Sequence, residues 1–248
     1  RQRVVWHPFT QHARWPTDDP LVVTGAEGMY LIDADGRRYL DGNSSLWVNV
    51  HGHRVPELDD AIRQQLDRMS HTTFLGVTHE PGVQLAEKLI ERAPDGLTRA
   101  FFGSDGSSSV EAALKMAFQS SAQRGTPRPL YVHIAEGYHG DTLGAVSVGG
   151  VELFHATYRP LLLETLPVGS PGLLRDGQTR AHRADEVVDE LRALMKERGD
   201  EVCAIIVEPM VQAAAGMLTH DAAFLRGARD IATKFGALLI VDEVATGI

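Results

Sequence analysis

Six apolar residues follow one another in the order Val202-Cys203-Ala204-Ile205-Ile206-Val207, and Glu208-Pro209 comes directly after them. A strand without a polar side chain on either face has to be covered on both faces, which is typical of parallel sheets. Three further short apolar runs share this character, namely 100–102, 130–134 and 237–241. We expect all four runs to be buried strands.

Amphipathic patterns lie between these runs. Apolar residues recur at intervals of three and four over 58–69, 110–118, 187–195 and 224–235, which predicts helices with one buried face. Gly236 follows the last pattern, at the position where a glycine commonly ends a helix. Apolar strands that alternate with amphipathic helices predict an α/β fold, in which helices sandwich a mostly parallel sheet.

The first 50 residues have a different, turn-rich pattern. The sequence Asp33-Ala34-Asp35-Gly36 separates the apolar residues of 29–32 from Tyr39-Leu40, which is typical of a β-hairpin. We therefore expect an N-terminal segment over 1–55 and a larger domain over 56–248.

The composition is that of a soluble globular protein. Among 248 residues, 33 are Asp or Glu and 24 are Lys or Arg, which gives a formal net charge of −9. This acidic balance, without any long basic run, argues against nucleic acid as a partner. Cys203 is the single cysteine, so no internal disulfide can form. No apolar run has the length of a membrane span, and we expect a cytoplasmic protein without a membrane partner.

Polar or glycine-rich segments follow the predicted strands. They are Gly103–Ser107, Gly137–Asp141, Glu208-Pro209 and Asp242-Glu243. Ligands of open α/β sheets bind beyond the carboxyl ends of the strands. The sequence therefore predicts that these four loops form one site.

Each loop has two interpretations. The Gly and Ser residues of 103–109 could hold a phosphate at the start of a helix, or simply cap that helix. Asp242 could pair with a protonated ring nitrogen, or cap a turn. Tyr138 and His139 could stack on a planar ring, or form a plain turn. Together, a phosphate cradle, a stacking residue and a buried carboxylate indicate a pyridoxal phosphate site.

Other chemistries lack their motifs. The chain contains no Walker loop, no G-x-G-x-x-G and no G-x-S-x-G sequence, which argues against nucleotide hydrolysis and a serine hydrolase. Its eleven histidines do not have H-E-x-x-H spacing, and we expect no metal site.

Five motifs carry a resemblance to a known family. They are Trp6-His7-Pro8-Phe9-Thr10-Gln11, Asp41-Gly42-Asn43-Ser44-Ser45-Leu46-Trp47, Gly137-Tyr138-His139-Gly140-Asp141-Thr142, Glu208-Pro209-Met210-Val211-Gln212 and Asp242-Glu243-Val244-Ala245-Thr246-Gly247. Over its whole length the chain resembles the class III, fold-type I aminotransferases, and within them the branch that serves biotin biosynthesis. The resemblance implies a pyridoxal 5'-phosphate enzyme, homodimeric when complete, that converts 7-keto-8-aminopelargonate to 7,8-diaminopelargonate.

The resemblance also implies roles for single residues. Gly106 and Ser107 would hold the cofactor phosphate, Asp242 the ring nitrogen, Tyr138 and Val244 the two ring faces, and Glu208 the side of the phenolic oxygen. Phe9, Trp47, Tyr138 and Asp141 would bind substrate. The N-terminal segment would then belong to a small domain and the substrate pocket, and residues 56–248 to the cofactor-binding large domain.

Three positions bear on the branch and the amino donor. Ala245 stands where many relatives with other substrates have Gln, which favours the biotin branch. Phe9 stands where some members have Tyr, and Leu46 where some have Trp. Together with residues 49–53, these two residues resemble those of the enzymes that use lysine as amino donor rather than S-adenosylmethionine. Both compounds remain candidate amino donors.

The resemblance places the Schiff-base lysine beyond Ile248, so no catalytic residue is assigned within this chain. Its four lysines, Lys88, Lys115, Lys196 and Lys234, fall in predicted helices. We expect the chain to be the N-terminal part of a longer enzyme, with the large domain truncated and without activity alone. The alternatives are an ω-amino acid or amine transaminase of the same class, and a short non-catalytic paralogue.

Overall fold

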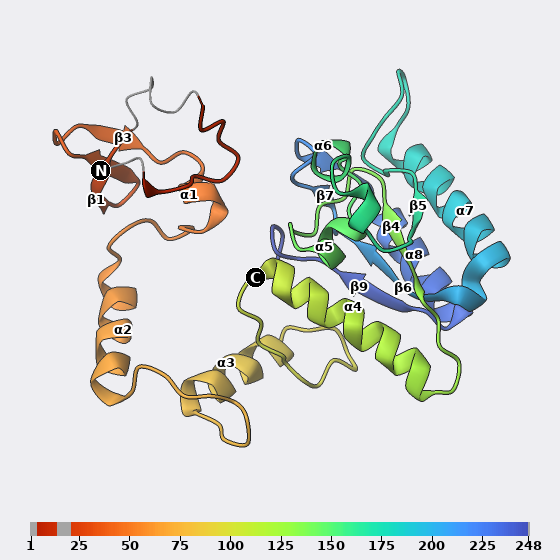
Figure 1. Ribbon diagram of the computed structural model, residues 1–248, viewed down its shortest axis with the longest axis horizontal. Helices are drawn as coiled ribbons and strands as arrows, with labels where there is room; N and C mark the ends of the chain where they lie inside the picture. The colour runs from red at the N-terminus through yellow and green to blue at the C-terminus, as the bar shows by residue number, and fades with distance from the viewer. Residues whose placement is uncertain (1–3, 14–20, 248) are drawn as a thin grey trace. The chain divides into compact units, whose positions relative to one another are not determined.

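The computed structural model describes residues 4–13 and 21–247, which divide into two compact units (Figure 1). The first unit is Arg1–Arg99 and the second is Ala100–Ile248. The boundary predicted after residue 55 falls inside the first unit, so residues 56–99 group here with the N-terminal segment. Ile248, which ends the predicted large domain, lies outside the described residues.

The second unit contains a four-stranded parallel sheet with the strand order β5-β4-β6-β9. The strands are β4 (Leu130–Ile134), β5 (Leu166–Val168), β6 (Val202–Val207) and β9 (Leu238–Val241). In register, Val132 lies opposite Ile205 and Ile206 opposite Ile240. The predicted α/β fold is confirmed, with the run at 202–207 fully buried as a central strand.

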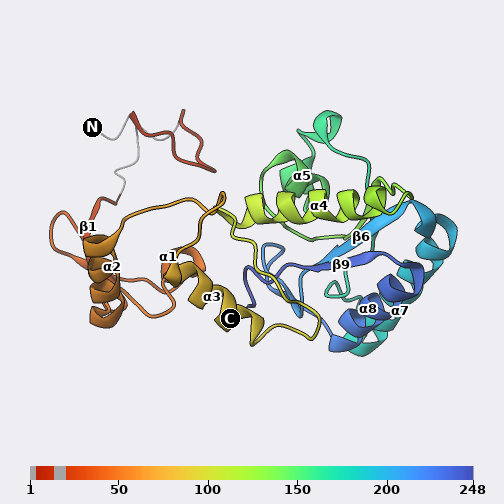
Figure 2. The same cartoon turned by 90° about the horizontal axis from the view of Figure 1, so that it is seen from below.

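Helices cover both faces of this sheet (Figure 2). Val202, Ile205 and Val207 of β6 pack into one core with α7 (Arg180–Arg198) and α8 (Ala222–Phe235). Ala204 and Ile206 pack into the other, with α4 (Gly106–Gln123) and α5 (Leu143–Ser147). Each fully buried Val or Ile contributes about 1.5–3 kcal/mol through removal of its apolar surface from water. Burial of both of its faces therefore stabilises β6 as the central strand of the sheet.

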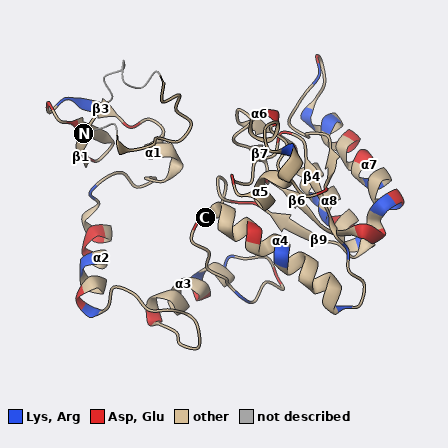
Figure 3. Cartoon of the chain, in the orientation of Figure 1, with Lys and Arg blue, Asp and Glu red and all other residues tan. Residues whose placement is uncertain are grey.

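The four predicted helices are confirmed. They are α2 (Pro56–Arg68), α4, α7 and α8. Gly236 follows α8 with φ +67°, the left-handed conformation that a glycine adopts without strain. Charged residues lie along α2 and α7, whereas the four strands of the parallel sheet carry no Lys, Arg, Asp or Glu (Figure 3).

The strand predicted at 100–102 is wrong. These residues are irregular, and Phe101 is 70% exposed. An apolar run forms a strand only where a neighbouring strand takes up its backbone hydrogen bonds, and the edges of the sheet in the described residues are β5 and β9. Conversely, the edge strand β5 was not predicted, because it has three residues and contains Pro167.

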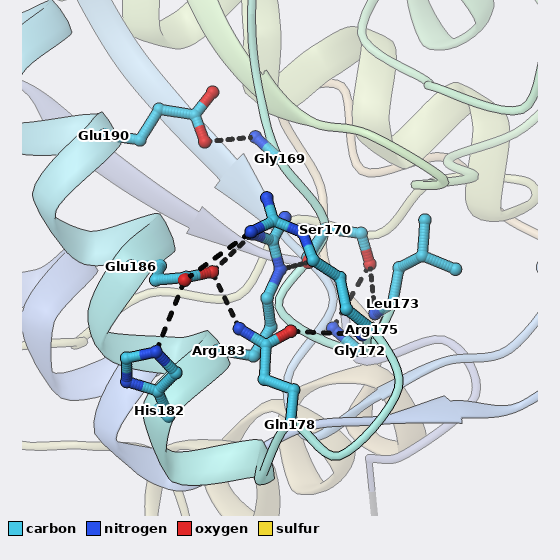
Figure 4. Close-up of polar contacts among 10 residues, drawn as sticks. All are labelled: Gly169, Ser170, Gly172, Leu173, Arg175, Gln178, His182, Arg183, Glu186 and Glu190. Atoms are coloured by element: carbon cyan, nitrogen blue, oxygen red, sulfur yellow. Dashed lines mark hydrogen bonds and ion pairs between the residues drawn. The ribbon is translucent and has the colours of Figure 1, made fainter.

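Polar contacts tie the loop after β5 to α7 (Figure 4). Glu186 accepts a hydrogen bond from Gln178 Nε2 at 2.8 Å and forms an ion pair with Arg183 at 3.0 Å. Arg183 Nε in turn donates to the carbonyl of Ser170 at 2.8 Å. The Ser170 hydroxyl donates to Gln212 Oε1 at 2.5 Å, so this loop is also fixed to the segment after β6.

The first unit begins with an antiparallel sheet of β1 (Val23–Glu27), β2 (Tyr30–Asp33) and β3 (Arg38–Leu40). The predicted hairpin is confirmed. Its turn is fixed by Asp33, whose carboxylate accepts the N–H groups of Asp35 and Arg37 and the Tyr39 hydroxyl.

The remaining elements are one helix of 11 residues, α3, and several shorter ones. They are α1 (Ser44–Trp47), α3 (Glu80–Ile90), α6 (Glu152–His155), η3 (Arg159–Leu161), η4 (Gly199–Glu201), β7 (Val211–Gln212) and β8 (Leu218–Thr219). Within the described ranges, no helix combines the length and apolar character needed to cross a membrane.

Candidate active site

Three contacts join the four predicted loops, of which 103–107 follows an irregular segment and not a strand. The backbone N–H of Tyr138 donates to Glu208 Oε1 at 3.0 Å. The N–H of Asp141 donates to Ser107 Oγ at 3.2 Å. His139 Nδ1 lies 2.7 Å from Asp242 Oδ2. The predicted convergence of the four loops is therefore observed, at the carboxyl edge of the parallel sheet.

The start of α4 forms one wall of the site. Asp105 caps the helix, because its carboxylate accepts the Ser108 N–H at 2.8 Å and the Ser108 hydroxyl at 2.7 Å. These hydrogen bonds lower the pKa of Asp105. Gly106 and Ser107 form the first turn, where backbone N–H groups point out of the helix and favour an anion. The two interpretations of this segment are therefore compatible. The helix cap uses the N–H of Ser108, whereas the phosphate would be held at Gly106 and Ser107.

Two glycines allow the walls to approach closely. A Cβ atom on Gly106 would lie 3.3 Å from Val244 Cγ2, which is tighter than ordinary contact. A Cβ atom on Gly140 would overlap the Ser107 side chain, and Gly140 has φ +120°. Only glycine fits at position 140, because a larger residue would be both strained and crowded.

Asp242 lies at the end of β9, where its N–H donates to the Val207 carbonyl at 2.8 Å. Its side chain is 7% exposed and that of His139 is fully buried. A buried carboxylate needs polar partners, and Asp242 has two of them, the His139 ring nitrogen and the Val244 N–H. Of the two interpretations of His139, stacking on a planar ring does not fit, because its ring is buried as the partner of Asp242.

Glu208 is buried and links two loops. Its Oε1 accepts the Tyr138 N–H, and its Oε2 accepts the Ala213 N–H at 2.9 Å. Burial raises the pKa of Glu208, with a further contribution from the negative charge of Asp242. One carboxylate oxygen therefore holds the loop that carries Tyr138, and the other holds the segment that follows β6.

Tyr138 is fixed by its own neighbours. Its hydroxyl donates to Asp141 Oδ2 at 2.9 Å, and its ring meets Phe154 edge-on with centroids 5.4 Å apart. Burial, followed by the hydrogen bond to Asp141, raises the pKa of Tyr138 to about 12. The hydroxyl is therefore protonated at physiological pH.

Phe9 and Trp47, the other predicted substrate residues, belong to the first unit. Phe9 is 82% and Trp47 46% exposed. Their contact with substrate stays a prediction, as do the cofactor roles of the residues described above.

The four lysines lie on helices, as predicted, and all are exposed. Within residues 4–13 and 21–247, no group of three or more His, Cys, Asp and Glu residues is placed so that it could hold a metal ion.

The roles of two motif residues, Gln212 and His139, could not be predicted from the sequence. Gln212 is buried, and its Nε2 donates to the Ala135 carbonyl at 2.8 Å while its Oε1 accepts from Ser170. It joins the loops after β4, β5 and β6. His139 is the buried partner of Asp242, and nothing in the Gly-Tyr-His-Gly motif indicated this role.

Comparisons with known proteins give a consistent result. A family model described as Aminotransferase class-III matches residues 12–248. An adenosylmethionine-8-amino-7-oxononanoate aminotransferase of Nitratidesulfovibrio vulgaris is 48% identical over 248 residues, which cover 98% of this chain and 46% of that protein. The chain spans about half the length of the curated relatives it matches.

Solved structures agree. The crystal structure of the aminotransferase of the same name from Methanocaldococcus jannaschii has a TM-score of 0.90 and 37% identity, and the match covers 98% of this chain and 53% of that one. An amine transaminase from an uncultivated Pseudomonas species, in a PLP-bound form, has a TM-score of 0.91 and 34% identity, with 98% and 56% covered.

Proposed function

The chain belongs to the class-III aminotransferase family, and we propose on this basis that it forms the cofactor-binding part of a pyridoxal-phosphate enzyme that aminates 8-amino-7-oxononanoate. The observation that carries the proposal is the meeting of four loops around Asp242, with His139 Nδ1 at 2.7 Å from its carboxylate. The names of relatives at 37–48% identity support this substrate.

The residues present fit the cofactor. The first turn of α4 is open to an anion. The site also contains two glycines, Gly106 and Gly140, at which an added Cβ atom would meet Val244 and Ser107 respectively. Gly106 and Ser107 would bind the phosphate, and Asp242 the pyridine nitrogen. Tyr138 and Val244 would contact the two ring faces, and Glu208 would lie on the side of the phenolic oxygen. When bound, pyridoxal phosphate supplies an electron sink for amino-group transfer.

The chain's own residues would prepare this site. Asp242, buried and given hydrogen bonds by His139 and the Val244 N–H, would keep a proton on the ring nitrogen. The buried Glu208 carboxylate holds the Tyr138 backbone by accepting its N–H. The protonated Tyr138 hydroxyl is held by Asp141, so the ring presents one orientation without further ordering.

We propose that Phe9, Trp47, Tyr138 and Asp141 bind the amino acceptor. The names of the relatives support S-adenosylmethionine as amino donor, whereas Phe9 and Leu46 favour lysine. A second candidate is an amine transaminase, supported by the structural likeness to that enzyme at 34% identity. We further propose a cytoplasmic homodimer for the full-length protein, as the family resemblance implies.

The test uses the full-length protein that carries this chain, supplied with pyridoxal phosphate. Each donor is offered with 8-amino-7-oxononanoate, and the diamine product is measured by mass spectrometry. Asp242→Ala is expected to reduce turnover on the order of 10²–10³-fold, because a buried charge aimed at the reacting group is lost. Asp230→Ala, at an exposed carboxylate of α8, is the matched control. Turnover of simple amines alone would favour the second candidate, and full activity of Asp242→Ala would refute the proposed site.

A further inference from the structure

The turn that carries Trp47 is left-handed. Ser44, Ser45, Leu46 and Trp47 have φ values of +52°, +51°, +67° and +69°. Residues with a Cβ atom rarely adopt this conformation even singly, because the side chain crowds the following carbonyl. Four in succession persist only when surrounding contacts hold them.

One carboxylate holds this turn. Asp41 Oδ1 accepts the N–H of Ser45 at 2.8 Å, and Oδ2 accepts the Ser45 hydroxyl at 2.8 Å. His53 Nε2 lies 2.9 Å from the same Oδ2. The Asp41 and His53 side chains are 5% and 15% exposed. Hydrogen bonds from Ser45, then from His53, lower the pKa of Asp41, so this carboxylate is ionised and bound on both oxygens.

Both members of the pair are anchored to the same β-turn. The N–H of Asp41 donates to the Met29 carbonyl at 2.8 Å. His53 exchanges backbone hydrogen bonds with Gly28 at 2.8 and 3.0 Å. Gly52, at φ +85°, permits this approach, since a Cβ atom there would lie 2.9 Å from the Gly28 carbonyl oxygen. The ends of the loop 41–53 are therefore fixed, and the side-chain pair spans them.

We infer that Asp41 and His53 are positioning residues, which hold the left-handed turn and thereby fix the orientation in which the Trp47 indole meets the substrate. The inference rests on the proposed function for the part that Trp47 plays. A half-exposed aromatic side chain on a fixed backbone binds an apolar substrate chain without first having to be ordered. Asp41 and His53 thus act on substrate affinity through Trp47 and need no contact with the substrate.

The test compares Asp41→Ala, His53→Ala and His53→Gln in the full-length protein, with Asp60→Ala as control because that carboxylate is 62% exposed. Hydrogen exchange by mass spectrometry reports the amides of 41–53. Near-ultraviolet circular dichroism, taken as the difference from Trp47→Phe in each background, reports the indole of Trp47. Kinetics report the KM for 8-amino-7-oxononanoate.

Asp41→Ala and His53→Ala are expected to speed exchange at Ser45, to remove the Trp47 signal and to raise KM roughly tenfold, the effect of about one lost hydrogen bond. The turnover number should change far less. His53→Gln keeps an N–H donor and should behave nearly as wild type.

A second substitution separates orientation from general damage. Ser44 joins the turn through its backbone, and glycine adopts positive φ freely. Adding Ser44→Gly to Asp41→Ala should therefore restore much of the exchange protection and the KM. Unchanged exchange and an unchanged Trp47 signal in Asp41→Ala would overturn the inference, and so would a loosened turn without a change in KM. If wild type does not use 8-amino-7-oxononanoate, the proposed function fails, and the Trp47 signal alone decides the positioning role.

Discussion

His139 Nδ1 lies 2.7 Å from Asp242 Oδ2, although 103 residues separate the two along the chain. The pair joins the loop after β4 to the end of β9, and both side chains are withdrawn from solvent. A buried carboxylate needs polar partners, so the contact with His139 contributes to the stability of the folded protein.

Replacing His139 by Ala should destabilise the protein by about 1–3 kcal/mol, because a buried carboxylate oxygen loses its partner. His139→Gln keeps a donor and should lose less. Urea unfolding followed by fluorescence measures the difference. His182→Ala, at an exposed histidine of α7, should stay within about 0.5 kcal/mol of wild type. Equal losses in His139→Ala and His182→Ala would contradict the pairing.

Gly140→Ala should destabilise by about 2–4 kcal/mol, because strain at positive φ adds to the overlap with the Ser107 side chain. The start of α4 should move with it, and affinity for pyridoxal phosphate should fall. Equilibrium dialysis and thermal unfolding check both effects. Gly177, also at positive φ but with open space around its Cβ position, is the control, and Gly177→Ala should cost only about 1 kcal/mol. Similar results for both variants would show that the Ser107 contact is unimportant.

Glu208 should make stability fall as pH rises above about 4.3, the value for glutamate in an unfolded chain. Its folded pKa is raised by burial, so the native state binds the proton more tightly and loses this advantage as pH passes through the folded pKa. Glu208→Gln does not titrate. As pH rises from about 4.3 to the folded pKa of Glu208, the unfolding free energy of wild type should fall relative to that of Glu208→Gln. At higher pH the difference between the two proteins should stay constant. A difference that grows in favour of wild type would mean that the folded pKa is lowered instead.

Tyr138→Phe should leave cofactor affinity within about threefold of wild type, because the ring face is kept, while the hydrogen bond to Asp141 is lost. One lost hydrogen bond of about 1 kcal/mol should then appear as a several-fold higher KM for the amino acceptor. Tyr138→Ala, which removes the ring as well, should weaken both. Cofactor titration and steady-state kinetics separate these effects, and a loss of cofactor affinity in Tyr138→Phe alone would place the hydroxyl, rather than the ring, at the cofactor.

The sequence predicted the features that depend on local pattern. The run at 202–207 is apolar on both faces, and β6 is accordingly buried between two helix layers. The spacing of Phe224, Ala228 and Ile231 predicted α8 and its buried face. Because the strands are parallel, their carboxyl ends share one edge, and this alone brought Glu208 and Asp242 to one site.

Features set by distant partners could not be predicted. The residues 100–102 are as apolar as a strand, but their conformation depends on a neighbour. His139 resembled a surface ring because nothing in Gly-Tyr-His-Gly shows which side of the turn is buried. The left-handed turn at Ser44–Trp47 contains no glycine to signal it. It depends on Asp41 and His53, whose meeting only the fold reveals.

The parallel pairing of β4, β6 and β9 has a consequence for the order of folding. Each ladder joins strands that are separated by a helix or more of chain, and β9 pairs with a strand formed about 35 residues earlier. Folding rates fall as native contacts become more distant in sequence. The hydrogen bond between His139 and Asp242 has one of the longest spans in the unit, so it can close only after β9 has docked. During synthesis on the ribosome, the part of the site where His139 meets Asp242 would therefore be the last part of this unit to assemble.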